Sequence, residues 1–141
     1  MEKSKKLFIS KNLNIDPKKT LLIGDFITFC AKSLPIENGF CVKVVDDRDK
    51  HEIGTTGAYR VGQNDIRVYA RRRALVDVLR SIAHEMTHMM QDEQGMITGP
   101  VQDAGGFHED QANAKAGELI KLYARKPGRR AIYESVKREI I

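Results

Sequence analysis

The chain has 141 residues, of which 41% are hydrophobic and 30% charged, and a formal net charge of +5 at pH 7. This length and composition predict a single domain, residues 1–141, with a buried core. The sequence has no apolar run of membrane-spanning length, and its basic start is not followed by a signal-peptide stretch, so we expect a cytoplasmic protein with no membrane partner. Cys30 and Cys41 form no C-x-x-C pair, which excludes a zinc ribbon and a disulfide scaffold.

Lysines and arginines cluster near the start of the chain, at residues 71–73 and at residues 121–130. Such clusters can attract nucleic acid or acidic partners, although more often they are solvated faces. No nucleic-acid motif or basic groove interleaved with aromatic residues accompanies them here. Nucleic acid is therefore a partner that the sequence allows but does not favour.

The first half of the chain predicts one helix and then a group of strands. Residues 1–15 are basic and weakly patterned, which indicates a loose N-terminal arm or a short first element. Asp16 and Pro17 are typical of an N-cap and the first helical position, and apolar spacing continues to about Leu34. Strands are predicted at 40–45, 55–61 and 65–70, with a charged loop or hairpin tip at 46–52 and a turn at 62–64. We expect these strands to form a small antiparallel or mixed sheet.

The second half predicts helices. Apolar residues at helical spacing indicate a long helix over 73–94, which Gly95 is placed to end. A glycine-containing loop over 96–106 leads to a second long helix over about 107–126, closed by Pro127, and a last helix is predicted over 131–140. The predicted fold class is α+β, with a three-stranded or slightly larger sheet packed on the two long helices.

The first of these long helices carries the pattern H-E-x-x-H, formed by His84, Glu85 and His88. Residues four apart lie one turn above each other on a helix, so both histidines can reach one ion at about 2.0–2.1 Å. Glu85 then lies beside the ion as a general base. The histidines avoid the apolar stripe of the helix and share its polar side with Asp77, Ser81, Gln91 and Asp92.

A third protein ligand is needed for a catalytic zinc site, and the second long helix offers Glu109. Glu109 leads a stripe that is otherwise small or apolar, and a carboxylate there is costly to bury unless it binds a cation. Asn113, one turn later, is predicted to accept the outer N–H of His84 and fix its tautomer. His108 is the rival ligand, but neighbouring helical residues diverge by about 100°, and we expect His108 to be an exposed rim residue.

The motif of His84, Glu85 and His88, followed by Glu109, resembles the gluzincin branch of the zincin metallopeptidases. The resemblance implies a zincin-like fold, one Zn²⁺ per chain bound by His84, His88 and Glu109, and Glu85 as the catalytic base. Asn113 stands where gluzincins often have an orienting aspartate. The resemblance to gluzincins therefore implies a zinc-dependent metallopeptidase, a hydrolase that cleaves a protein or peptide substrate.

The strand over 55–61 is the predicted substrate-binding element. Gly57 and Ala58 carry almost no side chain, so an extended substrate backbone can approach them and Tyr59 if this strand lies at the edge of the sheet. The oxyanion-stabilising residue stays open between Tyr59, Tyr133 and His108.

Two alternatives differ in what the site does. Residues 56–91 also resemble Spartan-type proteases, which act near DNA, but the missing cysteine ribbon and the helix that carries Glu109 argue against this alternative. The second alternative is a non-catalytic binding or assembly protein with a structural zinc. Glu85 argues against it, because a purely structural site needs no base. The chain does not resemble a metzincin, because Gln91 and Gln94 replace the glycine and third histidine of that signature.

Overall fold

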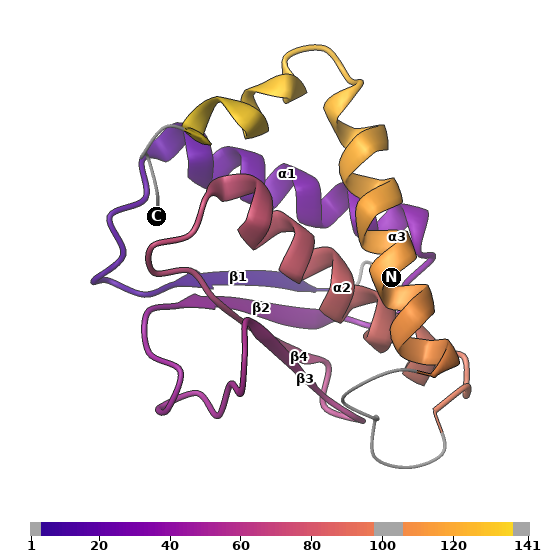
Figure 1. Ribbon diagram of the computed structural model, residues 1–141. Coiled ribbons are helices and arrows are strands. Elements are labelled where there is room, and N and C mark those ends of the chain that lie inside the picture. Colours follow the sequence, from indigo (N-terminus) through magenta and orange to yellow (C-terminus); the bar gives the residue numbers. More distant parts are fainter. Residues whose placement is uncertain (1–3, 98–105, 137–141) are drawn as a thin grey trace.

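A computed structural model describes residues 4–97 and 106–136 of the chain. In these residues it shows an α+β fold in which helices lie over one face of a mixed four-stranded sheet (Figure 1). No helix in the described ranges is long and apolar enough to cross a membrane. The elements in chain order are β1 (Lys5–Ile9), α1 (Pro17–Ser33), β2 (Phe40–Val45), β3 (Gly57–Arg60), β4 (Asp65–Tyr69), α2 (Leu75–Glu93), α3 (Phe107–Ala124) and the 3₁₀ helix η1 (Arg129–Val136).

The strand order in the sheet is β1-β2-β4-β3. β1 and β4 both run parallel to β2, with Leu7 and Ile66 on either side of Val42. β3 pairs antiparallel with β4 and has no strand on its other side in the described part of the chain. β3 is therefore an edge strand, as the substrate-binding hypothesis requires.

Local sequence signals set the ends of the helices. The side chain of Asp16 accepts a hydrogen bond from the backbone of Lys19 at 2.8 Å, and Pro17 follows as the first residue of α1, as predicted. After α2, Gly95 adopts a φ of +75°, the left-handed conformation that glycine allows at a helix end.

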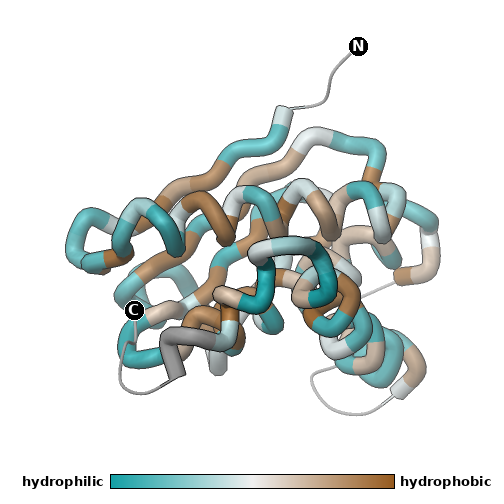
Figure 2. Tube along the Cα trace, turned by 90° about the horizontal axis from the view of Figure 1, so that it is seen from above, coloured by the Kyte–Doolittle hydropathy of each residue, from teal (hydrophilic) through white to brown (hydrophobic). Residues whose placement is uncertain are grey.

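The core lies between the sheet and the helices. Apolar residues (brown in Figure 2) recur along the helices and strands, where they can face one another. In the middle of α2, Leu79, Ile82 and Met86 are completely buried. The far end of α3 is fixed to α1, because the Tyr123 ring packs on Phe26 with centroids 5.1 Å apart and its hydroxyl donates to Asp25 at 2.7 Å. This packing anchors the C-terminal part of α3, while Glu109 lies in the first turn of the same helix.

Three expectations from the sequence need correction or refinement. Residues 5–9 are strand β1 rather than a loose arm, because their backbone pairs with the distant β2. The segment 46–52 is no hairpin tip, because β2 pairs with β1 and β4 and not with β3. The last element is the 3₁₀ helix η1, which begins at Arg129, and residues 137–141 of the predicted helix lie outside the described residues.

Candidate metal centre

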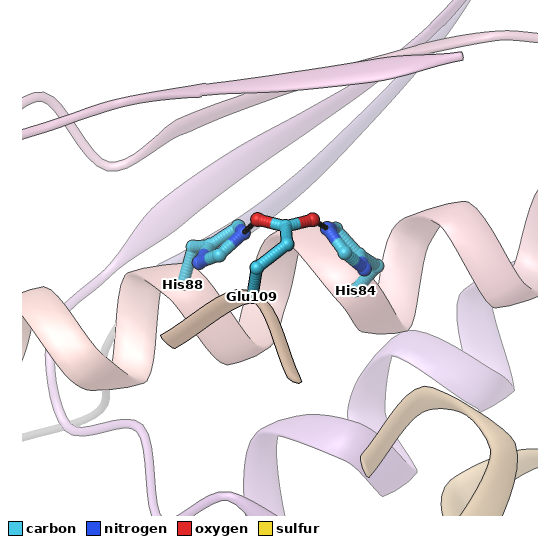
Figure 3. A group of neighbouring side chains, drawn as sticks. All are labelled: His84, His88 and Glu109. Atoms are coloured by element: carbon cyan, nitrogen blue, oxygen red, sulfur yellow. Dashed lines mark hydrogen bonds and ion pairs between the residues drawn. The ribbon is translucent and has the colours of Figure 1, made fainter. Parts of the chain in front are cut away.

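His84 and His88 lie one turn apart on α2, with ring centroids 4.8 Å apart and nearly perpendicular planes. Glu109 reaches them from α3. One of its carboxylate oxygens lies 2.8 Å from Nε2 of His84, and the other lies 3.1 Å from Nε2 of His88. Figure 3 shows the carboxylate between the two rings. The structure thus brings together the three predicted ligands from two helices.

These three residues fit a divalent metal ion. One possible ligand atom from each of them lies within 4.8 Å of the others. A tetrahedral zinc ion with bonds of about 2.0–2.1 Å holds its ligand atoms roughly 3.3 Å apart, so side-chain movements on the order of 1 Å would bring the three residues around it. Two imidazoles and one carboxylate are also a donor set that catalytic zinc sites use, with a fourth position left for water.

Glu85 is buried beside this group, with 8% of its surface exposed. Burial, followed by the charge of Glu109, raises the pKa of its carboxyl group to about 8, with the charge of Arg67 acting in the opposite direction. A divalent cation at the neighbouring ligands would act in the opposite direction and favour the carboxylate. The protonation state of Glu85 is therefore sensitive to the charge at the metal site, as suits a group that takes and returns a proton.

The edge strand approaches Glu85 at Gly57. A Cβ atom added to Gly57 would lie 3.1 Å from both Cγ and Oε2 of Glu85. The glycine is therefore what allows the strand and this carboxylate to come so close.

A cleft of about 550 Å³ opens between β3 and the two helices. It is lined by the ligands, by Glu85 and by Gly57, Ala58 and Tyr59, which are the three predicted substrate-binding residues. A second hollow of about 390 Å³ continues past His84 and Glu85, and Arg73, Arg80 and Asn113 contribute to its wall. His84, Glu85 and Glu109 therefore line both hollows, and His88 lines the first.

Comparison with known proteins adds one distant likeness. No protein-family model matches the chain, and the search of curated proteins gave no match. Among solved structures, the crystal structure of a Wss1 mutant from Saccharomyces cerevisiae is similar, with 15% sequence identity and a TM-score of 0.47. The likeness covers 93% of this chain and 92% of that one. Neither a shared fold nor an activity follows from similarity at this level.

The other predicted site residues lie in different places. Asn113 is exposed at the surface of α3 and makes a side-chain hydrogen bond with His84. Burial lowers the pKa of His84, while Glu109 and this hydrogen bond with Asn113 act in the opposite direction. His108 does not join the ligand group. It is half-buried rather than exposed, and its Nδ1 atom has no hydrogen-bond partner among the described residues.

The two tyrosines proposed for the oxyanion also differ. The Tyr59 hydroxyl donates a 2.5 Å hydrogen bond to Asp92 on α2, so its proton is already engaged. Burial and this bond to Asp92 raise the pKa of Tyr59. Tyr133 packs against the core and is absent from the walls of both hollows as far as the chain is described.

Three consecutive residues at the end of α2, which sequence reasoning did not assign, hold three different segments. Gln91 contacts His88 and α3, Asp92 accepts hydrogen bonds from Tyr59 and from the backbone of Gly62, and Glu93 accepts two from the backbone before β2. Because successive helical residues point about 100° apart, three adjacent side chains can reach three directions. The signal available in the sequence was the position of Gln91, three residues after His88 on the same helix face.

Proposed function

We propose that this protein is a zinc-dependent metallopeptidase, with His84, His88 and Glu109 as zinc ligands and Glu85 as general base. The observation that carries the proposal is the position of Glu85. Its buried carboxylate lies between the ligand group and Gly57 of an edge strand, at the wall of an open cleft. A site that only bound metal for stability would have no need of an ionisable group there.

The chemistry divides between the metal and this chain's own residues. Zinc, when bound, supplies a water molecule of lowered pKa and polarises the scissile carbonyl group. Glu85 accepts a proton from the attacking water and then donates it to the leaving nitrogen. His84, His88 and Glu109 hold the ion at a fixed place on two packed helices, so the water and Glu85 meet in a defined geometry.

The substrate is a protein or peptide in extended conformation along β3. The free edge of β3 offers backbone N–H and C=O groups, with which a peptide can pair as an added strand. The small side chain of Ala58 leaves room in the cleft for the peptide backbone, while the missing side chain of Gly57 leaves room for Glu85 beside the strand. Binding through backbone groups suits an enzyme that accepts several sequences.

The test compares the wild-type protein with Glu85→Gln. A general base contributes about 10²–10⁴-fold, so the variant should keep its zinc and lose peptide hydrolysis by that order. Zinc is titrated in both proteins, and a peptide library is then digested under identical conditions. Glu118→Gln serves as the control, because Glu118 is an exposed residue of α3 that pairs with Lys115 and does not line the cleft.

The same digestion separates the alternatives. If wild-type protein with full zinc cleaves nothing in a metal-dependent way, or if Glu85→Gln is as active as wild type, the site is a binding module and the peptidase proposal is wrong. Repeating the digestion with and without duplex DNA, at several salt concentrations, tests for a Spartan-type protease. A requirement for DNA that weakens with salt would favour that alternative.

A further inference from the structure

We propose that Gln91 is a positioning residue that fixes the tautomer of His88, and that the backbone of α3 imposes this choice. The inference rests on the proposed metal ligands but does not depend on peptidase activity. Gln91 is completely buried, although its side chain is polar. Such a group needs hydrogen-bond partners for both ends of its amide, and here it has three.

Its contacts join the two helices of the site. The Oε1 atom of Gln91 lies 2.9 Å from Nδ1 of His88. Its Nε2 atom donates to the backbone carbonyl of His108 at 3.0 Å and to the side-chain oxygen of Gln111 at 2.8 Å. One amide group on α2 therefore contacts both a ligand histidine and the first turn of α3.

The carbonyl of His108 decides how this amide is oriented. A glutamine amide can in general be flipped, with oxygen and nitrogen exchanged. A backbone carbonyl can only accept, so the group that faces His108 must be the N–H₂ end of Gln91. The oxygen of Gln91 then faces His88, and because that oxygen can only accept, Nδ1 of His88 must carry the hydrogen. In the neutral ring, this leaves the lone pair on Nε2, which is the nitrogen that faces Glu109 and the proposed metal position.

This chain of contacts couples the metal site to the packing of α3. His108 and Glu109 are neighbours in the first turn of α3. When this turn packs against α2, it therefore brings both residues to the site. The carboxylate of Glu109 supplies the third ligand, and the carbonyl of His108 orients Gln91. A histidine ligand whose tautomer is fixed before the ion arrives needs no tautomer change on binding, and loss of such an outer partner typically costs about 10–100-fold in metal affinity.

The experiment measures two properties of the full-length protein and its variants. Zinc affinity is determined by competition with a chromophoric chelator, and the protonated ring nitrogen of His88 is identified by ¹⁵N NMR with and without zinc. In wild type we expect a hydrogen on Nδ1 of His88 in both states. Observation of His88 bound to zinc through Nδ1 would overturn the proposal, whatever the variants do. A wild type that binds no zinc would instead remove the metal-site proposal, and the metal-free spectrum would still report on Gln91.

Two substitutions of Gln91 separate positioning from packing. Gln91→Met fills the space but removes the acceptor, so zinc affinity should fall by about 10–100-fold and the Nδ1–H signal should be lost or broadened. Gln91→Glu retains an acceptor for His88 and places a carboxylate beside the carbonyl of His108. If the role of Gln91 is only to join the helices, Glu is the worse substitution. If it positions His88, Glu keeps the Nδ1–H signal and binds zinc more tightly than Met.

The matched control is Gln111→Met, because Gln111 accepts a hydrogen bond from the same Nε2 atom, whereas Nδ1 of His88 is bonded to Oε1 of Gln91. Its zinc affinity should stay within a few-fold of wild type, and its Nδ1–H signal should persist. Thermal unfolding of all variants without metal reports on folding separately. Wild-type affinity in Gln91→Met, or weaker binding in Gln91→Glu than in Gln91→Met, would contradict the proposal.

Discussion

One wall of the cleft consists of helices and the other of a sheet edge. On the helical wall, His88 and Glu85 are buried, Glu109 bridges the two histidines, and the fully buried Gln91 joins α2 to α3 through hydrogen bonds. On the strand wall, all four residues of β3 are half-buried, and β3 pairs on one side only. The groups proposed for chemistry thus lie where packing is dense. The surface proposed for the substrate lies where backbone groups are free to pair with another chain.

Removal of the third ligand should have the largest effect on the helical wall. We expect Glu109→Ala to weaken zinc binding by more than about 100-fold, which exceeds the loss typical of residues that only orient a ligand. His108→Ala should change zinc affinity by less than about 10-fold, because His108 contacts Gln91 through its backbone carbonyl, which alanine retains. Chelator competition on both variants measures the difference. A larger loss in His108→Ala would transfer the ligand role to His108.

The second test addresses the place where the two walls meet. In Gly57→Ala, the new methyl group would lie 3.1 Å from two atoms of Glu85, so the carboxylate or the strand must shift by a few tenths of an ångström. Because a misplacement of 1 Å can cost about 10²-fold in rate, we expect kcat for a library-derived peptide to fall roughly 3–10-fold. Zinc affinity should not change, because the three atoms nearest to the added methyl group all belong to Glu85 and none belongs to a proposed ligand.

Gly54→Ala is the matched control for this substitution. Gly54 also lines the cleft, but a Cβ atom there would meet nothing within 4 Å. Its kcat and zinc affinity should therefore equal those of wild type. Equal kcat values for Gly57→Ala and wild type would show that Glu85 can move away without loss, and the strand wall would then have no influence on the base.

Local signals in the sequence predicted the helices but not the way in which the strands pair. Asp16, Pro17 and Gly95 set helix ends through contacts within a few residues, so the sequence alone indicates them. The parallel pairing of β2 with both β1 and β4 joins segments far apart in the chain. Residues 5–9 are weakly patterned, and they form a strand through pairing with the distant β2. A pattern within residues 5–9 alone does not predict this pairing.

The three proposed ligands could also be predicted from local sequence patterns. His84 and His88 follow from helical spacing alone, and Glu109 stands out as a carboxylate at the head of an apolar stripe. The contacts of Gln91 and Asp92 could not be predicted from the sequence. Their hydrogen-bond partners lie on α3, β3 and the turn after β3, and only the folded structure brings these segments together. That zinc binds at the group and that Glu85 acts as its base remain predictions, for which the experiments above are designed.

The smallest expected effect concerns the attachment of the strand wall to the helical wall. Asp92 accepts hydrogen bonds from the Tyr59 hydroxyl at 2.5 Å and from the Gly62 backbone at 2.7 Å, which hold the C-terminal end of β3 and the turn after it against α2. Asp92→Asn weakens both bonds and should reduce the free energy of unfolding by about 1 kcal/mol. Because the edge is then less fixed, we expect KM for the peptide to rise 2–5-fold, with kcat nearly unchanged. This rise is roughly what a loss of up to 1 kcal/mol in binding free energy produces.

Glu93→Gln is the matched control. It weakens similar hydrogen bonds to the backbone of Glu37 and Asn38, which do not line the cleft. It should therefore lower stability without raising KM. If both variants raise KM equally, the effect reflects general loosening of the protein, and Asp92 has no particular part in holding the substrate edge.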